Sequence, residues 1–224
     1  MIKLIKNILP KEKEYFFAIS MGVDSVAGYL FLKNKGYTVR PIHFNHKLRI
    51  QNDNMENKFV ELCKSTNEKP IIGYGENLQT EAECRNARLN FYKKYCSGGS
   101  IITAHHIDDY IESYLLNCFR GHPNREPFSL ESQFDNFKII HPFLLTRKKD
   151  FKQYLDRNNY LCYTIEDESN SSIKGSRRNW IRKQIVPEMI KNKLSLEKFA
   201  ERKIRNLLNF YSESSSIWSD APLS

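Results

Sequence analysis

The chain has 224 residues, of which 40% are hydrophobic and 27% are charged, and its formal net charge is +9. This length fits one domain of ordinary size with a small appendage, and the composition is typical of a soluble globular protein. The absence of any apolar run of roughly 20 residues, and of a secretory signal pattern at the N-terminus, argues against a membrane protein and predicts a cytoplasmic one without a membrane partner.

Short apolar runs alternate with helical patterns along most of the chain. Buried strands are expected at 15–19, 38–44, 69–74 and 100–104, with a further strand within 137–144. Helices are expected near 22–35, 53–66, 80–96 and 107–119. Near-continuous apolar strands that alternate with helices are typical of a parallel sheet covered on both faces. We therefore predict an α/β fold with an open, mainly parallel, twisted sheet.

The remainder of the chain is expected to be helical and basic. Thr146 is a candidate N-cap for a helix ending near Arg157, Pro187 predicts a break or kink, and 194–211 predicts a last amphipathic helix before a frayed tail. Between Lys174 and Arg205 there are 11 basic and 3 acidic residues, which leaves +8 of the net charge of +9. RNA or DNA is the natural partner of such a segment, and a solvated basic surface is the alternative.

Three polar clusters directly follow three of the predicted strands. They occupy residues 20–25, 45–49 and 105–109. Because ligands of open parallel sheets bind at the carboxyl ends of the strands, these clusters are expected to meet in one cleft.

The first cluster, SMGVDS at 20–25, has the layout of a phosphate-binding turn. Gly22 permits a tight turn, Ser20 and Ser25 supply hydroxyl groups, and the following helix directs its free N–H groups to the turn. Asp24 is unusual there, because an acid repels phosphates unless Mg²⁺ bridges the two. The plain alternative is a Gly-Ser turn in which the aspartate caps a helix.

Three acids gather at the start of the predicted helix 107–119, namely Asp108, Asp109 and Glu112. Their like-charge pairs cost about 0.2–0.5 kcal/mol each, and packing gains nothing from them. They suit a cation such as Mg²⁺ or a lysine ammonium group, the alternative being an acidic first turn on a solvated helix. The apolar stripe of this helix is expected to pack on the sheet, and it comprises Ile107, Ile111, Tyr114, Leu115 and Cys118.

The five cysteines are dispersed, odd in number and without a Cys-x-x-Cys motif. This pattern favours reduced thiols, and it disfavours a zinc ribbon or a cysteine-held iron–sulfur cluster.

The first cluster resembles the PP-loop of the N-type ATP pyrophosphatases, usually SGGxDS, with Met21 in place of a glycine. A positive φ would strain that methionine, whereas a negative φ would cost little. Three further blocks are similar to those of one PP-loop family, the tRNA(Ile)-lysidine synthases: IHFNHKLR (42–49), TEAECRNARLNFY (80–92) and TAHHIDDYIESYLLNCFRG (103–121). EDESN (166–170) followed by RRNWIR (177–182) resembles the D-x-SN…RNxIR signature of the same family.

The resemblance implies the adenine nucleotide alpha hydrolase-like fold and an ATP-dependent carbon–nitrogen ligase. In the implied reaction, ATP with Mg²⁺ adenylates the wobble cytidine of an isoleucine tRNA with a CAU anticodon, and pyrophosphate leaves. The ε-amine of L-lysine then displaces AMP and forms lysidine.

The resemblance also implies roles for individual residues. Catalytic roles are expected for Asp24, Arg88, Asp109 and Glu112, and the last two are also expected to bind lysine. Contacts to ATP are expected from Ser20, Met21, Gly22, Val23, Asp24, Ser25, His43, Asn45, His46, Ala104 and His105. Asp24 and Asp108 are the expected Mg²⁺ ligands, and Arg178, Asn179 and Arg182 are expected to face the tRNA or the adenylate.

Three segments are expected: an ATP-binding catalytic domain at 1–145, its remainder at 146–182, and a basic helical extension with a flexible tail at 183–224. Full-length family members usually continue into further C-terminal helical domains that hold the tRNA. Either the basic helices suffice here, or a second copy of the chain, a helper subunit or reduced specificity compensates.

Three alternative functions stay open. A PP-loop tRNA thiolase would share the adenylation step, but its usual catalytic cysteines or cluster motif are absent. An amidotransferase-type synthetase would act on a small molecule and leave the basic segment without a purpose. A non-catalytic tRNA-binding relic is disfavoured because Asp24, Asp109 and Glu112 are all retained.

Overall fold

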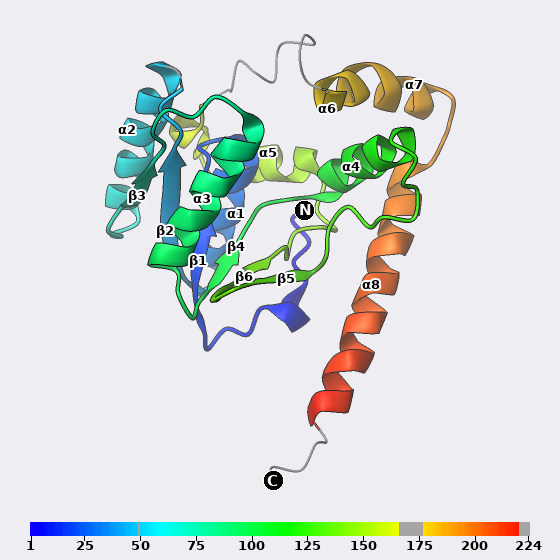
Figure 1. The fold of residues 1–224 in the computed structure, drawn as a ribbon, viewed down its shortest axis with the longest axis horizontal. Helices are drawn as coiled ribbons and strands as arrows, with labels where there is room; N and C mark the ends of the chain where they lie inside the picture. The colour runs from blue at the N-terminus through cyan, green and yellow to red at the C-terminus, as the bar shows by residue number, and fades with distance from the viewer. Residues whose placement is uncertain (49, 166–176, 220–224) are drawn as a thin grey trace.

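The computed structural model describes residues 1–48, 50–165 and 177–219. The described residues form a six-stranded sheet in the order β3-β2-β1-β4-β6-β5 (Figure 1). The strands are β1 (Glu14–Ala18), β2 (Thr38–Asn45), β3 (Ile71–Tyr74), β4 (Ser100–Ile102), β5 (Glu131–Phe134) and β6 (Phe137–Ile140). All neighbouring pairs are parallel except β5 with β6. The predicted mainly parallel α/β fold is confirmed.

Helices connect the strands and extend beyond the sheet. They are α1 (Val23–Asn34), α2 (Ile50–Ser65), α3 (Glu81–Tyr95), α4 (Ile107–Phe119), α5 (Lys148–Arg157), α6 (Arg177–Trp180), α7 (Val186–Lys191) and α8 (Leu196–Ser219). Short 3₁₀ turns lie at Lys6–Ile8 and Leu161–Tyr163, and one π-helical turn, η4 (Ile181–Ile185), joins α6 to α7. None of the described helices combines the length and the apolar character that crossing a membrane requires.

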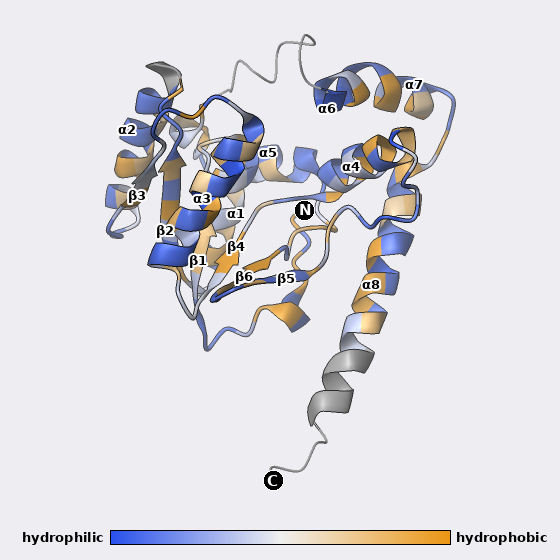
Figure 2. Cartoon of the chain, in the orientation of Figure 1, coloured by the Kyte–Doolittle hydropathy of each residue, from blue (hydrophilic) through white to orange (hydrophobic). Residues whose placement is uncertain are grey.

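The two faces of the sheet have separate cores, because side chains alternate along each strand. In β1, Tyr15 and Phe17 belong to the larger core, which α1, α2, α4, α5 and α8 complete. Phe16 and Ala18 point to the smaller core, where Phe91 and Tyr92 of α3 cover the sheet. Figure 1 shows α3 in front of the sheet, and Figure 2 shows how hydrophobic and hydrophilic residues alternate along the helices.

Two glycines allow close packing against these cores. A Cβ at Gly28 of α1 would lie 2.9 Å from the ring of Phe17, and one at Gly73 of β3 would lie 2.4 Å from the ring of Phe91. Since real Cβ contacts are longer, larger residues at these positions would force the helices away from the sheet.

The strand order reverses direction at β1, which pairs with β2 on one side and β4 on the other. The chain leaves β1 into the turn that precedes α1, and leaves β4 into the turn that precedes α4. In open α/β sheets this switch point is where ligands bind. Two of the three predicted polar clusters therefore lie side by side at the switch point.

Several local predictions were wrong. Thr146 does not cap α5, because its hydroxyl bonds to both the backbone N–H and the carbonyl of Lys3, and Arg147 is the N-cap. The sequence pattern did not predict β5, and α8 continues to Ser219 through part of the expected frayed tail. Pro187 does lie at a break, at the start of α7 after the π-helical turn.

The apolar stripe of α4 packs on more than the sheet. Ile107, Tyr110 and Ile111 are buried in the larger core, but the ring of Tyr114 faces Phe199 of α8 at a centroid distance of 4.7 Å. An apolar cavity of about 200 Å³ remains between α4, α7 and α8.

Candidate active site

The turn after β1 is organised by hydroxyl groups. The Ser25 hydroxyl donates to the Gly22 carbonyl at 3.0 Å and accepts the Ser20 N–H at 3.1 Å. The Ser20 and Ser25 hydroxyls are themselves 3.2 Å apart. Gly22 is the N-cap of α1 and offers no side-chain cap, so the first N–H groups of α1, at Val23 and beyond, open onto the turn. Such a helix terminus favours an anion.

Met21 has a left-handed backbone with φ of 62° and a side chain that is fully buried. A non-glycine residue in this region costs of order 1–3 kcal/mol. The side chain lies in the larger core, and the Met21 carbonyl accepts the N–H of Ile165 at 2.8 Å. Of the two alternatives for Met21, a positive and a negative φ, the structure has the strained positive one. Packing of the buried side chain offsets this strain.

Asp24 links this turn to the cluster after β4. One of its carboxylate oxygens, Oδ2, lies 3.4 Å from Nε2 of His106 and 3.9 Å from Nζ of Lys148. The other, Oδ1, is buried and has no hydrogen-bond partner within the described residues. A buried carboxylate oxygen without a partner costs free energy unless a ligand satisfies it. This oxygen fits a cation between the loop and a bound phosphate.

His106 is the N-cap of α4 and is almost fully buried. Its Nδ1 accepts the N–H of Asp109 at 3.3 Å, and the Asp109 carboxylate accepts the N–H of His106 at 3.2 Å, which completes a capping box. Burial disfavours the charged imidazole, but the charges of Asp109, Asp24 and Asp108 outweigh it and raise the pKa of His106. The sequence offered one signal for this role, because His106 lies two residues before the pair Asp108-Asp109.

The carboxylates at the start of α4 are held differently from one another. Burial would raise the pKa of Asp109, but the nearby histidines, the N–H of His106 and the charge of Arg182 together lower it. Asp108 accepts the N–H of Lys148 at 2.8 Å, in the first turn of α5. Asp108 therefore performs the capping role that Thr146 was expected to perform, and one of its oxygens is committed to it.

Glu112 is buried and pairs with Arg182 from the π-helical turn. Two nitrogens of the Arg182 guanidinium donate to the Glu112 carboxylate, Nε to Oε1 at 2.6 Å and Nη2 to Oε2 at 2.8 Å. This pairing with Glu112 raises the pKa of Arg182 further. Beside it, Arg178 of α6 donates to the Ser113 hydroxyl at 2.7 Å. The C-terminal segment thus reaches the acid cluster through two arginines that the resemblance singled out, and Asn179 between them is buried.

His105 belongs to a second group of side chains behind the acids. Its Nδ1 and the Nδ1 of His141 lie 2.8 Å and 2.7 Å from the Thr103 hydroxyl, which bridges them. The ring of Phe128 packs against both histidines. Burial lowers the pKa of His105 to about 4 and that of His141 to about 3, so both are neutral. Sequence reasoning missed His141 because it follows β6, outside the polar clusters.

Arg88, on α3, is half-buried. Burial lowers the pKa of His46, and the charge of Arg88 acts in the same direction. Arg88 also acts on His105 in the same sense, together with Arg178. Ala104 is half-buried after β4, next to Gly28 of α1. The charge of Arg88, on α3, therefore acts on His46 at the end of β2 and, together with Arg178 of α6, on His105 before α4.

Residues at the carboxyl end of β2 have structural partners. Nδ1 of His43 donates to the Ile19 carbonyl at 2.7 Å, and its ring stacks on Phe59. Asn45 donates to Glu56 of α2 at 2.7 Å and accepts the N–H of Lys47 at 2.9 Å. Its side chain thereby fastens the loop to α2. Arg49 and the EDESN block at 166–170, both parts of the resemblance, lie outside the described residues.

The described residues contain no group of three or more His, Cys, Asp or Glu side chains arranged to hold a metal by themselves. Asp24 and Asp108 nevertheless flank opposite nitrogens of His106, at 3.4 Å and 3.5 Å. Mg²⁺ is usually held by one or two carboxylates, with phosphates and waters completing the shell. The unpartnered Oδ1 of Asp24 is a carboxylate ligand of this kind.

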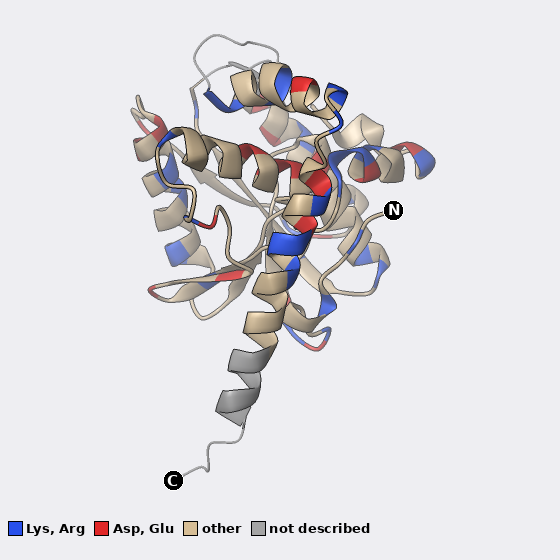
Figure 3. Cartoon of the chain, turned by 90° about the vertical axis from the view of Figure 1, so that its right-hand side faces the viewer, with Lys and Arg blue, Asp and Glu red and all other residues tan. Residues whose placement is uncertain are grey.

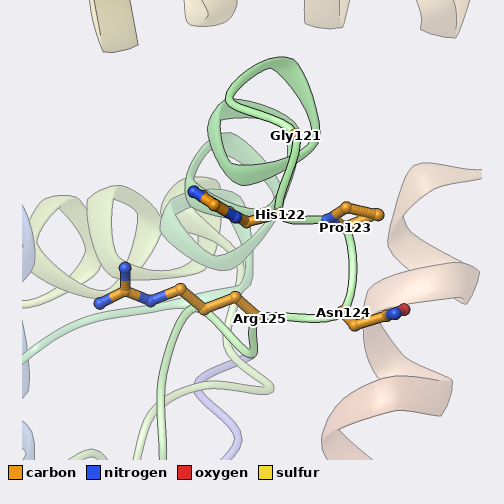
Figure 4. Close-up of a pocket in the computed structure, with 5 residues that line it drawn as sticks. All are labelled: Gly121, His122, Pro123, Asn124 and Arg125. Carbon is orange, nitrogen blue, oxygen red and sulfur yellow. The ribbon is translucent and has the colours of Figure 1, made fainter.

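One cavity among the described residues lies apart from these acids. It has a volume of about 330 Å³ and is lined by the loop Gly121–Arg125, which follows the opposite end of α4 (Figure 4). With a rise of about 1.5 Å per residue, α4 places this loop roughly 14–20 Å from the three acids.

Basic residues lie along the C-terminal helices. Figure 3 shows them on α8, the long helix that runs toward the C-terminus. Two acids of α8 pair with the sheet-bearing part of the chain, Glu197 with Arg147 and Glu201 with Lys3. The basic residues Lys198, Arg202 and Arg205 stay exposed.

A protein family and several named proteins are similar to this chain. A family model described as PP-loop domain matches residues 1–189. A tRNA(Ile)-lysidine synthase from Haemophilus ducreyi is 30% identical over 187 residues, which cover 81% of this chain and 43% of the relative. One from Buchnera aphidicola is 31% identical over 201 residues, which cover 82% and 44%.

The chain thus spans less than half the length of these curated relatives. Among solved structures, it is similar to a U34-tRNA thiolase from Methanococcus maripaludis, with a TM-score of 0.65 and 15% identity over 92% of this chain and 76% of that one. This second likeness concerns the fold alone.

Proposed function

The chain belongs to the PP-loop domain family, and on that premise we propose that it is an ATP-dependent ligase of the tRNA(Ile)-lysidine synthase type, acting in the cytoplasm. Its sequence relatives carry that name, and the blocks that resemble theirs contact one another, through Asp24 with His106 and through Glu112 with Arg182.

One observation carries the proposal. A single imidazole, that of His106, joins the nucleotide loop to the acid cluster: its Nε2 lies 3.4 Å from Asp24 and 3.5 Å from Asp109. A ligase with two half-reactions needs the α-phosphate and the attacking amine at neighbouring positions. The short path from Asp24 to Asp109 supports that arrangement.

ATP would bind with its phosphates at the N-terminus of α1. The hydroxyls of Ser20 and Ser25 and the free N–H groups of the helix would hold the phosphates. Asp24 would hold Mg²⁺, which when bound stabilises the negative charge that develops during adenylation. Arg88, across the cleft on α3, would stabilise the same charge.

Free L-lysine would bind at the acids of α4. Both oxygens of Glu112 already accept bonds from Arg182, whereas Asp109 lies 4.0 Å from that guanidinium and bonds to the N–H of His106. The lysine ammonium would therefore meet Asp109 first, and would reach Glu112 only by displacing Arg182. The neutral amine that attacks would form after proton loss in this shielded site.

The cytidine would enter from the side of α6. Chemistry on a base requires it to leave its stack, as bases in an anticodon loop can do. The exposed basic residues of α7 and α8 would neutralise phosphates of the tRNA.

The test is lysine transfer by the purified chain. It combines isoleucine tRNA with a CAU anticodon, ATP, Mg²⁺ and radiolabelled lysine, with Asp109→Ala as the inactive control. Labelled tRNA that disappears in the control supports the proposal. ATP-dependent adenylation without lysine transfer would point to another PP-loop enzyme, and RNA binding without AMP release to a non-catalytic relic.

The cysteines support a thiolase reaction less than they would if their thiols were reactive. All five are free thiols, and burial raises the pKa of Cys63 and of Cys96 to about 12. Such thiols are poor nucleophiles at neutral pH.

A further inference from the structure

Two aromatic side chains from distant parts of the sequence meet on the surface. Phe119, the last residue of α4, is 58% exposed, and Trp180, the last residue of α6, is 42% exposed. Their ring centroids are 6.0 Å apart with an interplanar angle of 53°. Single exposed hydrophobic residues are normal on proteins, but two large rings in mutual contact form a continuous apolar surface. We refer to Phe119 and Trp180 as the aromatic platform.

Polar contacts of α6 and the π-helical turn with α4 hold the platform in place. Arg178 and Arg182, on either side of Trp180 in the sequence, bond to Ser113 and Glu112 of α4. Both rings therefore stand on elements that are fixed to each other by partly buried polar contacts. A pre-positioned surface of this kind loses little conformational entropy on binding.

The surroundings of the platform are basic. Arg120 follows Phe119 directly and is exposed, and the loop Gly121–Arg125 behind it lines the cavity of about 330 Å³. In Figure 4, the side chains of His122 and Arg125 extend to the same side of this loop. The next acid along the chain, Glu126, pairs with Tyr110 and Lys203. The surface thus combines stacking faces with positive charge.

We propose that the aromatic platform stacks an unpaired base of RNA, while the loop Gly121–Arg125 contacts the adjoining phosphates. Aromatic faces flanked by arginines are the means by which proteins hold single-stranded RNA, and paired bases do not offer their faces. The proposal rests on the proposed function, because it identifies a second contact for the same tRNA outside the cleft. It adds Phe119, Trp180 and Arg125 to the residues expected to bind RNA.

Tryptophan fluorescence offers a direct test. The chain has two tryptophans, and Trp218→Phe leaves Trp180 as the only one. This variant is titrated with an anticodon-type RNA hairpin and with a fully paired RNA duplex of equal length. The hairpin is expected to quench Trp180, and the duplex is expected to leave it unchanged.

Substitutions separate stacking from charge. Phe119→Ala and Trp180→Ala are each expected to weaken hairpin binding by about 5- to 150-fold, the range for loss of one stacked base. Trp180→Phe keeps a ring and is expected to retain most of the affinity. Arg125→Ala is expected to reduce the salt dependence of binding by about one phosphate contact, which the aromatic variants should not do. The thermal midpoint of each variant verifies its fold.

Two results would overturn the platform. The first is unchanged hairpin affinity in both alanine variants. The second is a change in the self-association of these variants, measured by ultracentrifugation, without a change in RNA binding. That second result would mean that this surface contacts protein. The lysine-transfer assay separates the two proposals. Transfer with unaffected alanine variants would remove the platform alone, and ring-dependent hairpin binding without transfer would remove the proposed reaction alone.

Discussion

Arg182 donates to both carboxylate oxygens of Glu112, at 2.6 Å and 2.8 Å, and so joins the π-helical turn to α4. The carboxylate is buried, whereas the guanidinium is 28% exposed. Two parallel bonds of this kind fix both distance and orientation. The pair thus holds the π-helical turn against α4.

Arg182→Met should destabilise the fold strongly. It leaves the Glu112 charge buried without its cation, a change that typically costs about 3–5 kcal/mol. Urea unfolding measures the loss. The double variant Glu112→Gln with Arg182→Met should lose less than the sum of the single variants. Glu61→Gln, which breaks an exposed pair with Lys58, is the control and should cost less than about 1 kcal/mol. Equal effects of the two single changes at positions 61 and 182 would contradict this assignment.

Met21→Gly should lower stability while leaving the turn able to bind ATP. Glycine adopts the left-handed backbone without strain, which gains about 1–3 kcal/mol. Removal of a fully buried side chain costs about 2–5 kcal/mol. Thermal unfolding and ATP binding, measured at a temperature where both proteins are folded, separate the two effects. A higher midpoint in the variant would mean that backbone strain exceeds the packing that Met21 supplies.

Asp24→Asn should strongly reduce adenylation with only a modest loss of stability. Oδ1 of Asp24 makes no bond that the substitution would break, and Oδ2 approaches His106 and Lys148 only at 3.4 Å and 3.9 Å, but a neutral amide is a poor Mg²⁺ ligand. Pyrophosphate release over a Mg²⁺ titration should fall by about 10²–10³-fold, the usual cost of losing one preorganised electrostatic contact. Asp135→Asn, at an exposed aspartate paired with Lys93, is the matched control. Full activity in the Asp24 variant would exclude it as a metal ligand.

Stability should fall with acid because His105 and His141 are buried as neutral rings. Their folded pKa values, about 4 and about 3, lie below the unfolded value of about 6.5. As pH falls below about 6.5, the unfolded state binds protons first, so unfolding becomes easier by up to about 1.4 kcal/mol per pH unit for each histidine. Urea unfolding across this range should therefore show a declining free energy.

His141→Asn should make that decline shallower, and His122→Asn, at an exposed loop position, should not. The raised pKa of His106 acts in the opposite direction, since its contribution is present at low pH and is lost as pH rises through that pKa. Comparison of each variant with the parent cancels this opposing effect. An identical slope in the His141 variant would mean that this ring does not titrate as a buried base.

The sequence predicts α4 at its full extent, 107–119, because acids in the first turn and an apolar stripe agree. It cannot predict β5, whose four residues ESQF carry little apolar alternation and depend on pairing with β6. The same limit applies to the site. The loop at 20–25 and the acids of α4 are visible as motifs, whereas the partners of Asp108 and Glu112 come from α5 and the π-helical turn and follow only from tertiary packing.

The direct pairing of β1 with β4 also has a kinetic consequence. Phe16 and Ile101 are neighbours in the sheet, yet 85 residues separate them in the chain. Closing so long a loop costs conformational entropy before the contacts it allows can form, and such non-local pairings form slowly. The PP-loop and the His106 cap reach each other only after this closure. ATP binding during refolding should therefore appear with the slowest phase, and it would report the completion of the sheet rather than its first strands.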